Sequence, residues 1–107
     1  MSKVSETLGD QQQAEIKMIK IKILSYKSPQ RYAVRQTLLA ARNELRKTHP
    51  DLDLSITEVK KLAEMEEYTH VVIYPSLVIN DKLVCIGRFP KKGEVIGWLQ
   101  QAVESHR

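Results

Sequence analysis

A chain of 107 residues is long enough for one domain and short for two. Hydrophobic residues make up 42% and charged residues 28%, which is typical of a globular domain, and no apolar run approaches the roughly 20 residues of a membrane span. The single cysteine, Cys85, excludes a disulfide or a cysteine-based metal cluster within one chain.

Residues 1–15 are polar and include three consecutive glutamines. This composition predicts a flexible N-terminal tail ahead of one domain over residues 16–107. The tail lacks the apolar core of a secretory signal, so we expect a protein of the cytoplasm with no membrane contact. A single cysteine fits that reducing compartment.

The net charge of +4 is unevenly distributed along the chain. Residues 16–47 contain nine basic side chains and one acid, whereas residues 51–67 contain six acids and two lysines. This asymmetry indicates a molecule with a basic face. A pI of 9.3 and an aromatic content of 6% are modest for a nucleic-acid-binding protein, so we expect a protein partner with acidic groups instead.

The first two expected elements are a strand and a helix. Isoleucines alternate with lysines from Ile19 to Ile23, and this period of two predicts a strand over residues 17–24. Ser28 is a favoured N-cap residue and Pro29 fits the first helical position, which predicts a helix over residues 29–47. The core face of this helix is expected to comprise Val34, Leu38, Ala41 and Leu45.

The remaining elements alternate in type. Apolar residues at every second position from Leu52 to Ile56 predict a second strand, and a helix is expected between Glu58 and Tyr68. Strands over 77–79 and 83–86 flank a two-residue turn, Asn80-Asp81, and a last helix opens at Pro90. The order β-α-β-α-β-β-α predicts an α/β fold, a four-stranded mixed sheet flanked by three helices.

Three segments carry a family resemblance. The first is the strand end Ile21–Leu24 followed by Ser28-Pro29-Gln30-Arg31, the second is Tyr74-Pro75-Ser76 with the strand and turn that follow, and the third is Gly87-Arg88-Phe89-Pro90-Lys91. In this order and at this spacing they resemble the thioredoxin fold over residues 17–104. The chain is most similar to the small thioredoxin-like redox-disulfide proteins of archaea and bacteria.

The resemblance also shows what this chain lacks. In that family the first segment is Cys-x-x-Cys, so Ser28 and Arg31 stand where the two cysteines would be. Thiol–disulfide exchange requires a thiolate, and neither serine nor arginine supplies one. The resemblance further implies that the Tyr74–Pro75 bond is cis, and that its loop faces the first helix, where family members present backbone groups to extended peptides.

One candidate binding site is the former active-site face. The residues that the resemblance places there are Ser28, Pro29, Gln30, Arg31, Tyr74, Pro75 and Ser76. A helix N-terminus beside Arg31 and Lys27 could also bind a small anion, such as a carboxylate or a phosphate. The alternative is that Arg31 is a solvated cation.

A second candidate site is a stripe of arginines on the first helix. At 100° per residue Arg31, Arg35, Arg42 and Arg46 follow one line beside the core face. The stripe is either an interface for an acidic partner or a solvated flank, paired with Asp51, Asp53 or the acids of residues 64–67.

These observations favour a redox-inactive binding or adaptor domain over an enzyme, with no cofactor and no metal. One alternative is an oxidoreductase or transferase that uses Cys85, although a cysteine in a strand of apolar residues is usually a small buried hydrophobe. Ser28 as a nucleophile would need a base, and His49, His70 and His106 show no triad spacing. Another alternative is a regulatory protein resembling KaiB, a likeness confined to the first strand and helix. The oligomeric state stays open.

Overall fold

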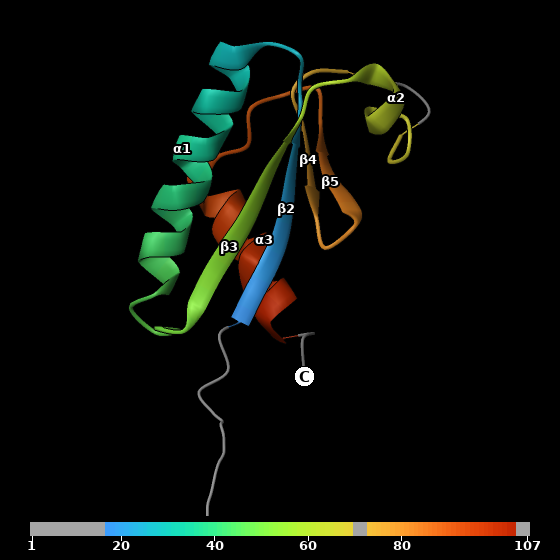
Figure 1. The fold of residues 1–107 in the computed structure, drawn as a ribbon. Coiled ribbons are helices and arrows are strands. Elements are labelled where there is room, and N and C mark those ends of the chain that lie inside the picture. Colours follow the sequence, from blue (N-terminus) through green and yellow to red (C-terminus); the bar gives the residue numbers. More distant parts are fainter. Residues whose placement is uncertain (1–16, 70–72, 105–107) are drawn as a thin grey trace, which may run out of the picture.

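The computed structural model describes residues 17–69 and 73–104, and the predicted tail over 1–15 lies outside these ranges. Seven elements follow one another in the expected order (Figure 1). They are β2 (Lys17–Leu24), α1 (Ser28–Leu45), β3 (Leu52–Val59), α2 (Leu62–Met65), β4 (Ser76–Ile79), β5 (Lys82–Ile86) and α3 (Lys92–Glu104). The predicted α/β class is therefore confirmed.

The sheet has four strands in the order β3-β2-β4-β5. β2 runs parallel to β3 and antiparallel to β4, and β4 is antiparallel to β5, so the sheet is mixed, as predicted. In Figure 1, α1 flanks the β3 side of the sheet, and α3 lies behind the strands. None of the helices in the described part of the chain is long and apolar enough to cross a membrane.

The main core lies between the sheet and the helices α1 and α3. The alternation in β2 places Ile19, Ile21 and Ile23 on this face, against Val34 and Leu38 of α1. Burial of this apolar surface is the main term that stabilises the fold. The predicted core face of α1 is confirmed, since Val34, Leu38, Ala41 and Leu45 are all buried.

The second helix is much shorter than predicted. The expected helix over 58–68 was wrong at its start, because Glu58 and Val59 continue β3 and pair with Ile23 and Leu24 of β2. A parallel ladder along all eight residues of β3 outweighs the helical spacing of the local sequence. Only a small cluster, with Met65 buried at its centre, covers the second face of the sheet.

The hairpin between β4 and β5 has the predicted two-residue turn. Asn80 and Asp81 have φ values of 49° and 67°, the left-handed conformations of a type I′ turn. The Asn80 N–H donates to the Lys20 carbonyl at 2.8 Å, and the Asn80 Oδ1 accepts from the Lys20 N–H at 2.9 Å. The turn is therefore bonded to the central strand.

Two predicted helix boundaries shift slightly: α1 ends at Leu45 and α3 begins at Lys92.

Candidate functional site

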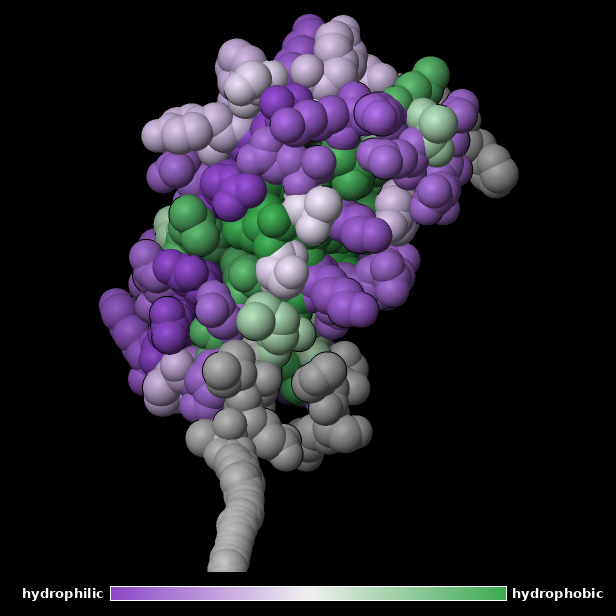
Figure 2. Space-filling view, in the orientation of Figure 1, coloured by the Kyte–Doolittle hydropathy of each residue, from purple (hydrophilic) through white to green (hydrophobic). Residues whose placement is uncertain are grey.

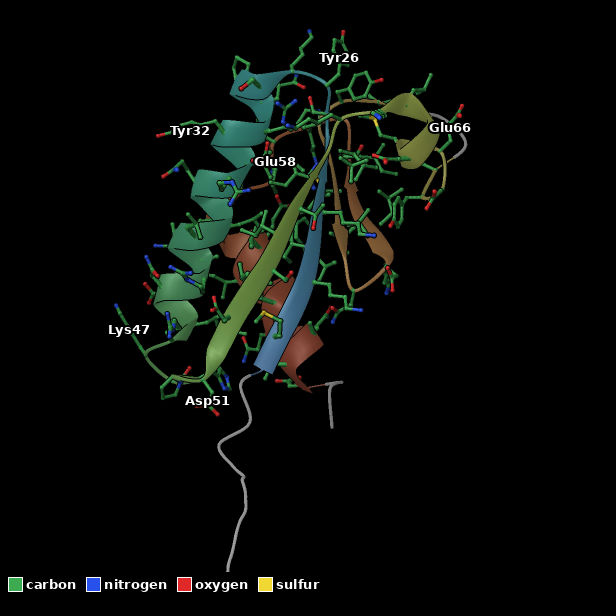
Figure 3. The ribbon with its side chains drawn as sticks, in the orientation of Figure 1. Tyr26, Tyr32, Lys47, Asp51, Glu58 and Glu66 are labelled. Carbon is green, nitrogen blue, oxygen red and sulfur yellow. The ribbon has the colours of Figure 1, made fainter. Side chains whose placement is uncertain are left out.

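The topology brings four connecting segments to one end of the sheet. β2 and β3 are parallel and end there, β4 is antiparallel to β2 and begins there, and β5 ends there. Residues 28–31 and 74–76, far apart in sequence, therefore lie at the same end, which we call the sheet end (Figure 3). The two halves of the former active-site face are brought together as the resemblance implies.

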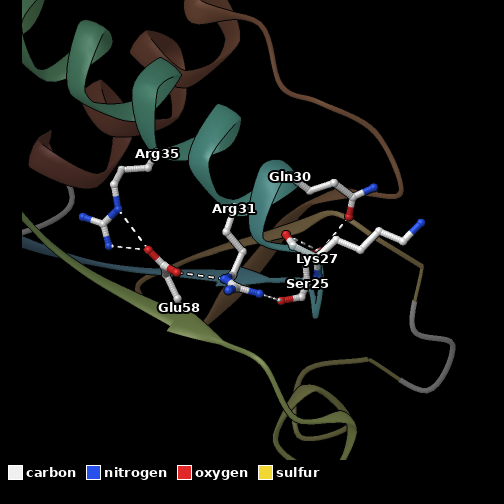
Figure 4. A network of polar contacts seen from close by, with 6 residues as sticks. All are labelled: Ser25, Lys27, Gln30, Arg31, Arg35 and Glu58. Atoms are coloured by element: carbon white, nitrogen blue, oxygen red, sulfur yellow. Dashed lines mark hydrogen bonds and ion pairs between the residues drawn. The ribbon is translucent and has the colours of Figure 1, made fainter.

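The start of α1 differs from the prediction. The N-cap position is Lys27 and has no side-chain cap, while Ser28 is already in the helix and exposed. The buried Ser25 bonds this turn instead: its Oγ accepts from the Lys27 N–H at 3.0 Å and donates to the Gln30 Oε1 at 2.6 Å (Figure 4). The prediction that Ser28 is the N-cap is therefore wrong. The serine that bonds the turn before the helix is Ser25, three residues earlier.

Arg31 is not an exposed cation. Its side chain is only 11% exposed, its Nε donates to the Glu58 Oε1 at 2.8 Å, and its Nη1 donates to the Ser25 carbonyl at 3.0 Å (Figure 4). The guanidinium is therefore turned toward β3 and the β2–α1 turn. The alternative of a solvated Arg31 is therefore wrong, and the binding of a small anion at this helix N-terminus stays a prediction.

Glu58 joins a second arginine to this network. Arg35 donates to the Glu58 Oε2 through Nε at 3.1 Å and Nη2 at 2.9 Å. Hydrogen bonds from Arg31, then from Arg35, lower the pKa of Glu58 below its ordinary value, and they outweigh partial burial, which acts in the opposite direction. The sequence analysis missed Glu58 as a partner, because it placed this residue in a helix. Its even spacing from Leu54 and Ile56 is the signal that could have placed it in the strand.

The other two arginines of the stripe lie nearer the end of α1. Arg42 Nη1 lies 3.4 Å from Asp53 Oδ1, and these side chains are 24% and 43% exposed. Arg46 is exposed, with its Nη2 3.5 Å from the Pro50 carbonyl. Three of the four arginines therefore pair with acids of β3, and Asp53 is one of the acids that the sequence suggested.

Opposite the start of α1 lies the loop before β4. The Tyr74–Pro75 bond is cis, as the resemblance implies. The Pro75 carbonyl accepts from the Gly87 N–H at 2.9 Å, which fixes this loop to the end of β5. Gly87 has a φ of 70°, and a Cβ there would lie 2.5 Å from the Ile73 Cγ2, so only glycine allows this close approach.

Tyr74 presents both a ring and a free backbone unit. Its ring lies edge-to-face on Tyr26, with centroids 4.7 Å apart and an interplanar angle of 83°. Within residues 17–69 and 73–104, no hydrogen bond engages the backbone N–H or C=O of Tyr74. These two groups are available to a polypeptide that lies across the loop.

Exposed apolar side chains gather around Tyr74. Of seven large hydrophobic residues that are exposed in the described ranges, five belong to loops, the end of β5 or the start of α2 at the sheet end. We call them the sheet-end cluster, and they are between 47% and 57% exposed: Tyr26, Leu62, Ile73, Ile86 and Phe89. A concentration of this kind is a feature of interaction surfaces.

The loop that carries Phe89 is held by an ion pair. Arg88 donates through both Nη atoms to the two carboxylate oxygens of Glu94, each at 2.8 Å. The Arg88 hydrogen bonds, followed by the Lys91 N–H, lower the pKa of Glu94 to about 2. The carboxylate is therefore ionised throughout the neutral range, and it joins this loop to the first turn of α3.

Cys85 is remote from solvent. It is 3% exposed, pairs with Leu77 across the hairpin, and its Sγ donates to the Arg88 carbonyl at 3.4 Å. Burial raises the pKa of the Cys85 thiol above its ordinary value. Of the histidines, His49 follows the end of α1, while His70 and His106 lie outside the described residues.

Comparison with known proteins agrees with this fold. The family model described as a thioredoxin domain matches residues 19–100, and the chain belongs to that family. The match extends from β2 into α3 and so includes the β2–α1 turn and the loop before β4. Neither the curated proteins nor the solved structures give a significant match.

Proposed function

We propose that this chain is a thioredoxin-fold binding domain that takes up extended segments of partner proteins at the sheet end and does not exchange thiols. The observation that carries the proposal is the sheet-end cluster, together with the backbone of Tyr74, which has no hydrogen-bond partner among the described residues. An extended segment could bond to that backbone unit while its side chains contact Tyr26 and Phe89. The cytoplasm is the compartment that we propose, since one buried thiol needs no oxidising environment.

The absence of thiol chemistry in this proposal follows from the side chains at the start of α1. The family resemblance implies that Ser28 and Arg31 stand at the positions of the family's cysteines, and a serine hydroxyl is too weak an acid to ionise at a helix N-terminus. Arg31 is bonded to Glu58 and is not available as a nucleophile or a base. His49, at the far end of α1, is too distant to activate Ser28.

Two alternatives from the sequence have less support. An enzyme that uses Cys85 needs an accessible thiolate, whereas burial removes Cys85 from solvent and raises its pKa. A regulatory protein resembling KaiB rested on β2 and α1 only. The family match over residues 19–100 continues through the hairpin into α3, which favours the thioredoxin side of the comparison.

The sheet end is also a better binding surface than the arginine stripe. Arg31, Arg35 and Arg42 already pair with acids of their own chain, so a partner would have to compete with those ion pairs. The sheet-end cluster has no such competitor. Binding of an acidic partner through Arg46, the exposed member of the stripe, is the second candidate function.

Peptide selection tests the proposal. We would select 12-residue peptides from a random phage library against the full chain and measure their affinity by fluorescence polarisation. Tyr26→Ser and Phe89→Ser should each weaken binding about tenfold or more, because exposed aromatic residues commonly dominate such contacts. Met18→Ser is the matched control, since Met18 is 45% exposed near the start of β2, at the opposite end of the sheet.

The proposal fails if Met18→Ser weakens binding as much as the two aromatic substitutions. It also fails if no selected peptide binds the wild-type chain more tightly than a scrambled sequence of the same composition.

A further inference from the structure

β3 is an edge strand of the described sheet, and backbone groups of every second residue point outward from it. It has β2 on one side and no neighbour on the other among the described strands. The Val59 carbonyl accepts from the Ser25 N–H on the β2 side, so by alternation Leu54, Ile56 and Glu58 direct their backbone groups outward. The Leu54 N–H is occupied by the Asp53 carboxylate at 2.8 Å. An edge of this kind is a template for another strand.

The outer surface beside this edge is apolar. Leu54 and Ile56 are half-buried and pack on the main core from its margin. Figure 2 shows the hydrophobic strip on the surface between α1 and β3. The strip has an ion pair at each end, Arg35 with Glu58 and Arg42 with Asp53. Apolar side chains between charges are suited to an added strand with apolar residues at every second position.

We infer that a second copy of this chain pairs with the first, β3 against β3 and antiparallel. Residues whose backbone groups point away from β2 must lie opposite one another in the two copies. A two-fold axis that passes through Ser55 gives this pairing over the stretch from Leu52 to Glu58. In this register Leu54 lies opposite Ile56 of the second copy, and Ile56 opposite Leu54. The apolar strip is therefore complementary to itself.

The same register fits the charges. Asp53 lies opposite Thr57 of the second copy, so no two acids face each other directly.

The inference predicts which residues can be cross-linked. Ser55 faces Ser55 of the second copy in a non-hydrogen-bonded pair, where Cα atoms lie about 4.5 Å apart, within the range of a disulfide. Under mild oxidation Ser55→Cys should form a disulfide-linked dimer. Thr57→Cys is the matched control, because the two introduced cysteines would lie roughly 14 Å apart along the strands. When the Asp53→Cys and Thr57→Cys variants are mixed, a disulfide should form between the two different chains.

The wild-type chain provides the background, since Cys85 is 3% exposed and should give no dimer. Sedimentation equilibrium adds a measurement that does not depend on cysteine. Ser55→Lys places two like charges at the axis on exposed side chains and should shift the dimer to monomer, whereas Ser55→Thr should leave it unchanged.

A wild-type chain that is monomeric at all concentrations up to about 0.5 mM overturns the inference. If Thr57→Cys gives as much disulfide-linked dimer as Ser55→Cys, the proposed register is overturned. The peptide-binding test at the sheet end is unaffected by either outcome, because it involves other residues.

Discussion

The two sides of the sheet end use their polar groups in opposite ways. On the α1 side, Arg31, Arg35 and Glu58 satisfy one another, and Ser25 bonds the turn before the helix. On the Pro75 side, the backbone of Tyr74 has no partner in the described ranges, and the side chains around it are apolar and exposed.

The difference separates a structural role from a binding role. Groups that are bonded within the chain stabilise the fold and are unavailable to a ligand, whereas free backbone groups beside exposed aromatic rings can bind one. At the start of α1, where the family resemblance implies a dithiol, Arg31 of this chain is in an ion pair with Glu58. The loop opposite keeps the open geometry that suits an extended polypeptide.

The largest expected effect is a gain of activity. Wild type should not reduce insulin disulfides above background, whereas Ser28→Cys with Arg31→Cys should restore a dithiol at the start of α1, where the helix N-terminus favours a thiolate. The measurement is insulin precipitation with a thiol reductant as electron source. Wild-type activity that persists in Cys85→Ser would contradict the redox-inactive assignment.

Loss of Glu58 should cost the most stability. Glu58→Ala leaves the guanidinium of Arg31 buried without its carboxylate, and we expect a loss of about 3 kcal/mol in the free energy of unfolding. Urea denaturation followed by circular dichroism measures it. Glu44→Ala is the control, because Glu44 pairs only with exposed lysines, and should change stability by less than about 0.5 kcal/mol. Equal losses in the two variants would show that the network is not structural.

The contribution of Glu58 should depend on pH. Because its pKa is lowered in the folded state, its stabilisation is complete above the ordinary value of 4.5 and is lost as the pH falls through the lowered value. The difference in unfolding free energy between wild type and Glu58→Gln should therefore be constant near neutral pH and shrink below about pH 4.5. A difference that grows on acidification would contradict the assigned ion pair.

The smallest effect is expected at Arg42. Its contact with Asp53 is longer, at 3.4 Å, and more exposed than the Glu58 network, so Arg42→Gln should cost about 0–1 kcal/mol. Thermal melts in low and high salt check this. Salt should reduce the difference in melting temperature between wild type and Arg42→Gln. A loss as large as that of Glu58→Ala would mean that the stripe stabilises as one unit.

Local signals predicted most of the fold. The alternation in β2, the core face of α1 and the Asn80-Asp81 turn are each visible within a few residues, because period and turn chemistry act locally. The helix expected from Glu58 failed, since pairing of β3 with β2 depends on residues more than thirty positions away.

The candidate site was predicted in part. The family resemblance brought residues 28–31 and 74–76 together, but the burial of Arg31 could not be read from α1 alone. Its partner Glu58 lies 27 positions later in sequence and becomes a neighbour only through the sheet. The sheet-end cluster was missed for the same reason, since its five members come from the β2–α1 loop, the start of α2, the loop before β4, and the end of β5 with the loop after it.

The most direct test of the central claim is to map where a bound peptide lies. We would titrate ¹⁵N-labelled protein with a phage-selected peptide and follow the backbone amide shifts. The account predicts the largest changes at Tyr26, Ile73, Tyr74 and Phe89, with little change at Arg35 and Arg42. Changes centred on Arg35, Arg42 and Arg46, with the Tyr74 region unaffected, would contradict it and assign binding to the arginine stripe.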